Sequence, residues 1–333
     1  MQRSIAVLSL CAGLAVSGMT RAQSFNIEVN NGAITAVSNS FGAAGLPGAW
    51  NSYNSSSPAT IPLVNLDGSA SGVTFTRSLV ANYATAATAN ISDFKAVLDD
   101  YQFVTGVSQM SMTFNNLQPG VYMVIVYNGA PSAANVANYW SPEQTSPTWN
   151  YGGGTVGANT FKPLRTHNYM VCQTNGSNAI NVKVQAAAGE ARVSAIQIVK
   201  LTTDWRVYVN TPTRGSQAGT SWLSAMGDLQ DALNIARVLE DRCEIWVGSG
   251  TYKPTAGTDR TLAFDVAPGV SIYGGFAGTE TSIGQRSGLP ADETILSGAI
   301  GTAAATDNSR TVVKVNFAGT RAVTLDGLTI RDG

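Results

Sequence analysis

Short apolar runs set off by glycine recur through the last third of the chain. They occupy residues 244–247, 270–276, 294–296, 311–315 and 322–330. Their centres lie roughly 17 to 27 residues apart, the period of a solenoid in which each coil stacks on the one before. Glycines such as Gly248, Gly274 and Gly327 stand where the backbone must turn a sharp corner. The pattern predicts a stack of parallel strands.

One amphipathic helix is expected just before this series, over residues 226–239. Leu229, Leu233 and Ala236 recur at helical spacing, and Asp228 lies in the first turn, where the helix dipole favours a negative charge. We expect the apolar stripe of this helix to cover the open first coil of the stack.

The first two thirds of the chain alternate short apolar runs with clusters of Gly, Pro, Asn and Ser. This is the pattern of an antiparallel sandwich rather than of alternating strands and helices. The clearest strands are expected at residues 73–75, 110–114, 121–127, 180–184 and 193–199.

Four motifs in this part resemble the galactose-binding-like jelly rolls of secreted bacterial proteins. They are residues 40–51 (SFGAAGLPGAWN), 66–68 (LDG), 117–122 (LQPGVY) and 195–199 (AIQIV). The resemblance implies a jelly-roll domain over residues 24–202. Turn-and-strand motifs of this kind also occur in sandwiches of other topology, which stay open here.

A second ordered set of motifs resembles the N-terminal portion of the pectin-lyase-like right-handed parallel β-helices of bacterial surface proteins. The set comprises GTSW (219–222), DLQDAL (228–233), IWVGSGTYKP (245–254), YGGFAGTET (273–281), TILSG (294–298) and LDGLTI (325–330). The resemblance implies an all-β chain whose residues 203–333 begin a β-helix with a capping helix. We expect this β-helix to be incomplete at its C-terminus, because the sequence stops inside a new coil.

The first 22 residues have the order of a secretory signal peptide. Arg3 supplies the charged region, residues 5–16 the apolar region, and residues 20–22 a small-residue cleavage site. Export to the extracellular space or the outer cell surface is therefore expected. No later stretch reaches about 18 apolar residues, so a membrane-spanning helix is not expected in the mature chain.

The net charge and the small number of cysteines and histidines narrow the possible functions. The 333 residues carry a net charge of −1, and only 12% are charged, so the chain has no field that would attract nucleic acid. After cleavage the cysteines are Cys172 and Cys243, and the single histidine is His167, which we expect in a loop or on the surface. Neither a disulfide framework nor a metal or cofactor site is predicted.

No catalytic residue is predicted either. The resemblance implies that polysaccharide lyases of the β-helix fold bind calcium through carboxylates stacked on one sheet, beside a basic residue. Acidic residues such as Asp265, Asp292 and Asp326 fall in different parts of the coils, which is typical of solvated turns.

Aromatic residues give the remaining functional signal. The residues selected as a carbohydrate site are Trp140, Trp149, Tyr151, Asn138 and Trp50. Flat rings stack on the C–H faces of sugars while amides bind the hydroxyls. The alternative is that these rings pack the ends of the sandwich.

The favoured hypothesis is a secreted or cell-surface, non-enzymatic protein that binds a glycan or a cell-surface polysaccharide, with a β-helical stalk. One alternative is a polysaccharide lyase or glycoside hydrolase whose catalytic coils lie beyond residue 333. Another is a purely structural surface protein. The sequence leaves the identity of the sugar and the oligomeric state open.

Overall fold

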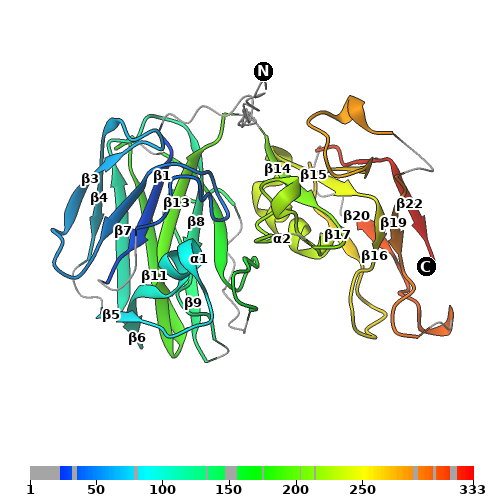
Figure 1. Ribbon diagram of the computed structural model, residues 1–333, viewed down its shortest axis with the longest axis horizontal. Coiled ribbons are helices and arrows are strands. Elements are labelled where there is room, and N and C mark those ends of the chain that lie inside the picture. Colours follow the sequence, from blue (N-terminus) through cyan, green and yellow to red (C-terminus); the bar gives the residue numbers. More distant parts are fainter. Residues whose placement is uncertain are drawn as a thin grey trace, which may run out of the picture.

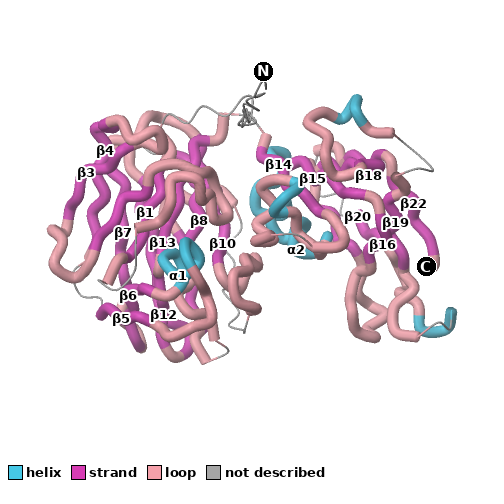
Figure 2. The backbone as a smooth tube through the Cα atoms, in the orientation of Figure 1, coloured by secondary structure: helices cyan, strands magenta, loops and turns pink. Residues whose placement is uncertain are grey.

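A computed structural model describes residues 23–31, 36–78, 82–132, 134–146, 156–174, 176–202, 204–213, 215–287, 292–302, 305–315 and 321–333. The expected signal peptide lies outside these ranges. The described chain is mostly β-strand, as the sequence predicts (Figures 1 and 2). No helix in the described part of the chain is long and apolar enough to cross a membrane.

Residues 25–200 form three sheets, with strand orders β10-β8-β13-β1-β2, β3-β4-β7-β11-β9 and β12-β6-β5. The strands are β1 (Phe25–Val29), β2 (Trp50–Tyr53), β3 (Thr60–Val64), β4 (Ala70–Arg77), β5 (Asn82–Thr85), β6 (Asp100–Thr105), β7 (Gln109–Asn115), β8 (Val121–Tyr127), β9 (Val136–Trp140), β10 (His167–Gln173), β11 (Ile180–Ala188), β12 (Glu190–Val193) and β13 (Ala195–Lys200). A short helix that the sequence analysis missed, α1, spans Ser92–Leu98. Pairing is antiparallel except between β1 and β2, which run parallel.

Two five-stranded sheets face each other across an apolar core. In β7 the buried side chains alternate with partly exposed polar ones, and Met110, Met112 and Phe114 point inward. Phe75 of β4 meets Phe114 with ring centroids 5.2 Å apart. This alternation is the pattern of a sheet with one face in the core and one in solvent.

The sheet that contains β8 differs, because it is buried on both faces. Residues 122–127 of β8 are all fully buried. Tyr122, Val124 and Val126 belong to the sandwich core, whereas Met123, Ile125 and Tyr127 belong to a second apolar cluster on the opposite side. The uninterrupted apolar run in β8 therefore reflects cover on both faces.

Part of that cover comes from the glycine-rich segment around residues 38–49. The backbone N–H of Ala44 donates to the Tyr127 hydroxyl at 2.7 Å. The side-chain amide of Gln197, on β13, donates to Asn26 Oδ1 at 2.7 Å and to the carbonyl of Gly42 at 3.2 Å. These bonds fasten the segment to the sheet and satisfy polar groups that lie out of water.

From β14 onward every pair between named strands is parallel. The strands are β14 (Trp205–Val209), β15 (Cys243–Gly248), β16 (Gly250–Tyr252), β17 (Phe264–Val266), β18 (Ser271–Phe276), β19 (Thr294–Ser297), β20 (Val313–Val315), β21 (Thr324–Asp326) and β22 (Leu328–Arg331). They form sheets in the orders β14-β15-β18-β21, β16-β19-β22 and β17-β20. The chain thus visits three sheets in the same order twice and then starts a third circuit.

Glycine marks the corners of these circuits. The apolar run at 322–330, expected as one strand, is two strands on different sheets, because Gly327 between them adopts φ +68°. A Cβ on Gly327 would lie 2.6 Å from the carbonyl oxygen of Gly274 in the circuit below. The corner therefore needs glycine both for its conformation and for close stacking.

The expected helix is present as α2, Leu229–Leu239. It begins three residues later than predicted, because Met226 forms a bridge to Val209 of β14. Asp228 is the residue that caps it, accepting the N–H of Gln230 at 2.9 Å. An aspartate in this position satisfies a backbone N–H that the helix leaves unpaired.

Helix α2 is buried on two sides. One side packs on β14, β15 and β17, and the other on β10 of the sandwich (Figure 1). Lys162 forms an ion pair with Asp231 at 3.1 Å, and the N–H of Phe161 donates to the Ser216 carbonyl at 2.8 Å. The helix packs on the first parallel strands, as predicted, and it also covers the apolar outer face of the β8 sheet, which the sequence did not predict.

We expect Leu233→Asp to destabilise the protein by about 3–5 kcal/mol, since it places an unpaired charge in this shared core. Leu233 is 1% exposed. Asn234→Asp, one position along on a partly exposed face of the helix, is the control and should change the free energy of unfolding little. Chemical denaturation followed by tryptophan fluorescence measures both. A loss below about 1 kcal/mol for Leu233→Asp would contradict the shared core.

Hydrogen exchange should be faster at β22 than at β15. Both β21 and β22 lie at the edges of their sheets, and Ile330 is 49% exposed, whereas Ile245 in the middle of its sheet is fully buried. An edge strand opens without breaking a second ladder of hydrogen bonds. Equal protection of amides 329–331 and 244–247 would contradict this expectation.

Candidate functional site

The predicted carbohydrate-site residues do not form one cluster. Asn138 and Trp140 lie on β9, two residues apart, and therefore on the same face of the strand. Trp50 lies on β2 of the other large sheet, where its indole N–H donates to the Phe41 carbonyl at 3.1 Å. Trp149 and Tyr151 fall outside the described residues. The structure thus brings together Asn138 and Trp140 but not Trp50.

Asn138 and Trp140 belong to a continuous polar surface on the outside of the sheet β3-β4-β7-β11-β9. We call this surface the polar face. We define it by these outward side chains of the five strands: Asn138, Trp140, Asn181, Lys183, Gln185, Gln109, Ser111, Thr113, Asn115, Thr74, Thr76, Thr60 and Pro62. Amides and hydroxyls dominate it, and Trp140 is the one aromatic ring within this set.

Strand register fixes which of these side chains are neighbours. Trp140 lies opposite Lys183, and Asn138 lies opposite Gln185. A longer row crosses four strands through Asn181, Thr113, Thr76 and Thr60. Side chains directly opposite each other in a sheet have Cβ atoms about 5 Å apart, so each row is a line of closely spaced polar groups.

Hydrogen bonds between neighbouring strands hold these side chains in place. Lys183 Nζ donates to Ser111 Oγ at 3.2 Å, and Ser111 Oγ donates to Asn181 Oδ1 at 3.0 Å. Asn115 Nδ2 donates to Thr76 Oγ1 at 3.2 Å. Because the side chains are fixed before any ligand arrives, little conformational entropy remains to be lost on binding.

A hollow of about 510 Å³ lies at the β9 edge of the polar face. Its lining residues are Asn138, Tyr139, Trp140, Ser141, Gln144, Ser146 and Gln185. Tyr139 contributes to the wall from the core side, where its hydroxyl donates to the Arg192 carbonyl at 2.8 Å. The lining has one indole, several amides and several hydroxyls, and no formal charge.

Asn138 lines this hollow, but its Oδ1 is buried and accepts no hydrogen bond within the described part of the chain. That oxygen is therefore not a contact for a ligand. The amides and hydroxyls of the lining as a whole suit the hollow to a ligand with several hydroxyl groups.

Charge at the site is low and balanced. Lys183 is the one charged member of the polar face, and Glu143 lies at its margin, where one carboxylate oxygen accepts the Asn181 N–H at 3.0 Å and the Ser141 hydroxyl at 2.9 Å. Such a surface gives no net attraction to an anionic or a cationic polymer.

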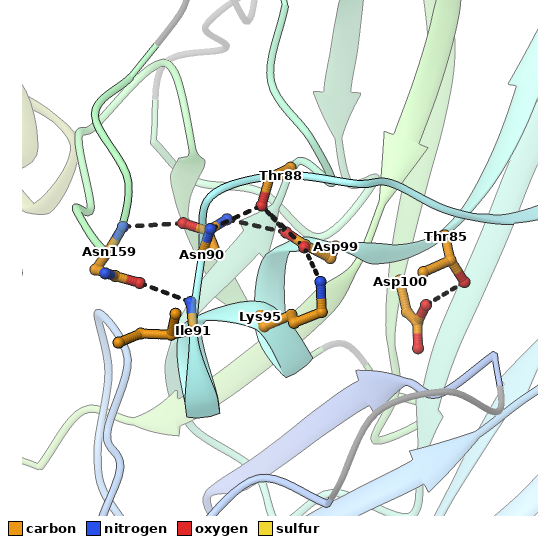
Figure 3. Close-up of polar contacts among 8 residues, drawn as sticks. All are labelled: Thr85, Thr88, Asn90, Ile91, Lys95, Asp99, Asp100 and Asn159. Atoms are coloured by element: carbon orange, nitrogen blue, oxygen red, sulfur yellow. Dashed lines mark hydrogen bonds and ion pairs between the residues drawn. The ribbon is translucent and has the colours of Figure 1, made fainter.

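A smaller cavity lies on another side of the sandwich, next to α1. Figure 3 shows the polar contacts around it, in which Thr88, Asn90 and Lys95 converge on the carboxylate of Asp99. Thr88 Oγ1 donates to Asp99 Oδ1 at 2.7 Å, and Lys95 Nζ pairs with Oδ2 at 3.1 Å. Asp99 is fully buried and fully bonded, so its role in this cluster is to hold the surrounding loops.

His167 is not the surface residue that the sequence analysis expected. It is fully buried at the start of β10, because that strand is covered on both faces. Its ring nitrogens contact Thr166 Oγ1 at 2.9 Å and the Tyr169 hydroxyl at 3.2 Å. Burial lowers the pKa of His167 to about 3, so the ring is neutral at physiological pH.

Glu28 also has a strongly shifted pKa. Burial raises its pKa to about 7, against opposing hydrogen bonds from Ser52 and the Val37 backbone and with added repulsion from Asp100. A carboxyl with this pKa could exchange protons near neutrality. Glu28 is 1% exposed, however, and it lines neither the hollow nor the smaller cavity.

Two carboxylates among the parallel strands form separate ion pairs and do not cluster. Asp265 pairs with Arg237 at 3.5 Å, on a different sheet from Asp326, which pairs with Arg286 at 3.0 Å. Among the residues that the structure describes, no three His, Cys, Asp or Glu side chains converge in a way that could hold a metal ion.

Sequence reasoning missed most of the polar face. Gln185, Ser111 and Asn181 are not among the predicted site residues, although the alternation of apolar and polar residues in 180–184 predicts a strand there. The signal that could have found them is the chemistry of the outward positions, which are amides and hydroxyls in one strand after another.

Neither a scan of protein-family models nor a search of curated proteins gives a match. Similar solved structures include the ANXUR2 extracellular domain from Arabidopsis thaliana, at 11% identity and TM-score 0.34, covering 53% of this chain and 48% of that one. Another is the CBM36-1 domain of a multidomain xylanase from the hindgut metagenome of Trinervitermes trinervoides, at 13% identity and TM-score 0.24, covering 38% of this chain and 95% of that one.

A third is the catalytic unit of a GH87 α-1,3-glucanase from Streptomyces thermodiastaticus, at 9% identity and TM-score 0.24, covering 78% of this chain and 44% of that one. The chain spans about half the length of the receptor ectodomains that it matches. These neighbours include carbohydrate-binding and carbohydrate-active proteins, but TM-scores of this size assign neither a fold nor a function.

Replacing Glu28 with Gln should make the protein more stable at pH 8 than the wild type, by up to about 3 kcal/mol. The folded-state pKa of Glu28 is raised from 4.5 to about 7. The wild type therefore loses stability as the pH rises from 4.5 to 7, because folding keeps the carboxyl protonated or buries its charge. A glutamine side chain does not titrate, so the stability of the variant has no such dependence on pH.

Urea unfolding of both proteins at several pH values measures this difference. The two curves should converge below pH 4.5 and separate up to about pH 7. A difference that does not change between pH 4 and pH 8 would show that Glu28 titrates normally.

Proposed function

We propose that this chain is an exported, non-enzymatic protein of the cell surface that binds an uncharged polysaccharide through its polar face. The observation that carries the proposal is the combination of Trp140 with the uncharged amide- and hydroxyl-rich hollow beside it. An indole face stacks on the C–H surface of a sugar ring, while Asn138 and Gln185 lie close enough to bond its hydroxyls.

The extent of the polar face favours a polysaccharide segment over a single sugar. The row from Asn181 to Thr60 crosses four strands. Strands lie about 4.8 Å apart, so this row alone is roughly 14 Å long. A glycan chain lying across the strands from Trp140 would pass Lys183 and Ser111 and lie beside the hydroxyl and amide groups of this row.

The finer fold assignment is also a proposal. We place a jelly-roll domain at residues 24–202 and the start of a right-handed parallel β-helix at 203–333. The repeated order in which the chain visits three parallel sheets supports the second assignment. In such a protein the coils would act as a stiff stalk and the sandwich as the adhesive module.

Trp140→Ala should weaken glycan binding at least tenfold while changing the melting temperature little. Trp140 is only partly buried and lies on the outer face, so it contributes to the complex more than to the fold. A fully buried tryptophan would instead cost about 3–5 kcal/mol of stability when truncated. Binding is measured on an array of neutral and charged glycans, followed by calorimetry with the best ligand.

Leu262→Ala is the matched control, since Leu262 is a 43% exposed apolar side chain in the other part of the chain. It should leave binding unchanged. The proposal fails if the wild type binds none of the neutral glycans, or if Trp140→Ala binds as well as the wild type.

A further inference from the structure

The smaller cavity next to α1 is separate from the polar face and has a volume of about 170 Å³. Its walls come from five places: the loop before α1, the end of α1, the turn after β8, the segment at 156–160 and the residue before β10. The lining residues that matter here are Thr88, Asn90, Leu98, Pro131, Val156 and Thr160.

The volume limits the size of the occupant. Drug-sized ligands need roughly 300–1,000 Å³. A cavity of about 150 Å³ accommodates one six-membered ring such as benzene. The cavity is thus suited to one ring.

The lining determines the chemistry of that ring. Leu98, Pro131 and Val156 offer apolar contact on one part of the wall. On the rest, Asn90 keeps a second amide N–H beyond its bond to Asp99. The hydroxyl oxygens of Thr88 and Thr160 keep an acceptor lone pair beyond the bonds that they make within the protein. The lining contains no charged side chain, and the carboxylate of Asp99 is turned away into its own bonds with Thr88, Asn90 and Lys95 (Figure 3). An uncharged ring with both C–H faces and hydroxyls fits this mixture.

The walls are held in place before any ligand binds. Asn90 Oδ1 accepts the Asn159 N–H at 2.9 Å, and Asn159 Oδ1 accepts the Ile91 N–H at 2.9 Å, a reciprocal pair that joins the loop before α1 to the segment at 156–160 (Figure 3). Ser92, Ala130 and Asn159 all have positive φ, at 50°, 45° and 55°. Backbone strain of this kind persists only where the surroundings enforce it, and it concentrates at functional sites.

We propose that this cavity is a second binding site, which takes a single uncharged pyranose ring. The same chain segment leads on to Phe161 and Lys162, which bond to Ser216 and Asp231 of the other half of the molecule. Occupancy of the cavity therefore stabilises the segment that joins the sandwich to α2.

The experiment is an NMR titration of the full chain with methyl glycosides of glucose, galactose and mannose. Saturable shifts are expected for the amides of Thr88, Ala89, Gly157 and Ala158, at millimolar ligand. Ala158→Phe, which fills the cavity from an exposed lining position, should weaken binding at least tenfold, and Ala89→Phe does so from the opposite wall. Ala187→Phe, on the exposed end of β11, is the matched control and should bind within twofold of the wild type.

The ring that binds in the cavity could be a free monosaccharide or the end of a glycan chain. A trisaccharide that ends in the most tightly bound monosaccharide distinguishes the two. Equal affinity for the trisaccharide and the monosaccharide shows that the cavity accepts a chain end, whereas binding of the monosaccharide alone shows that it takes a free sugar. Trp140→Ala should leave this titration unchanged, so failure of the cavity site and failure of the polar face are distinguishable. The proposal is overturned if no glycoside shifts these amides, or if both filled variants bind like the wild type.

Discussion

The burial of both faces of the sheet β10-β8-β13-β1-β2 is the constraint on which the rest of the structure depends. One face of this sheet closes the sandwich core, and the other receives the segment around residues 38–49, helix α1 and helix α2. Helix α2 in turn packs on the first parallel strands. The sandwich and the parallel strands therefore share one apolar cluster, in which Leu233 and Ile125 both take part.

This arrangement also decides where a ligand can reach the sandwich. The β8 sheet is covered, whereas the outer face of the opposite sheet carries partly exposed side chains in the described part of the chain. Its strands alternate inward apolar residues with outward amides and hydroxyls, so that folding the core automatically presents the polar face. Trp140 lies on the edge strand β9, where it lines the hollow. Structure and proposed binding thus follow from the same period-two pattern.

Much of this could be predicted from the sequence, and the rest depended on contacts between distant segments. The strand at Val121–Tyr127, the helix near 229–239 and the glycine corners follow from local pattern and are present. The burial of His167 did not follow, because it depends on α2 and the 38–49 segment covering β10. The separation of Trp50 from Trp140 could not be predicted from the sequence either, since it depends on which sheet each strand joins. The polar row through Asn181 and Thr113 required the strand register, which sequence periodicity alone does not supply.

The most direct test of this account is to map where a neutral oligosaccharide touches the protein. The indole N–H of Trp140 and the side-chain amides of Asn138 and Gln185 each give a distinct signal in an NMR spectrum of the full chain. The account predicts that a bound neutral oligosaccharide shifts these signals together, with smaller shifts along the row from Asn181 to Thr60. Shifts confined to the parallel strands, with the signals of Trp140, Asn138 and Gln185 unchanged, would contradict it.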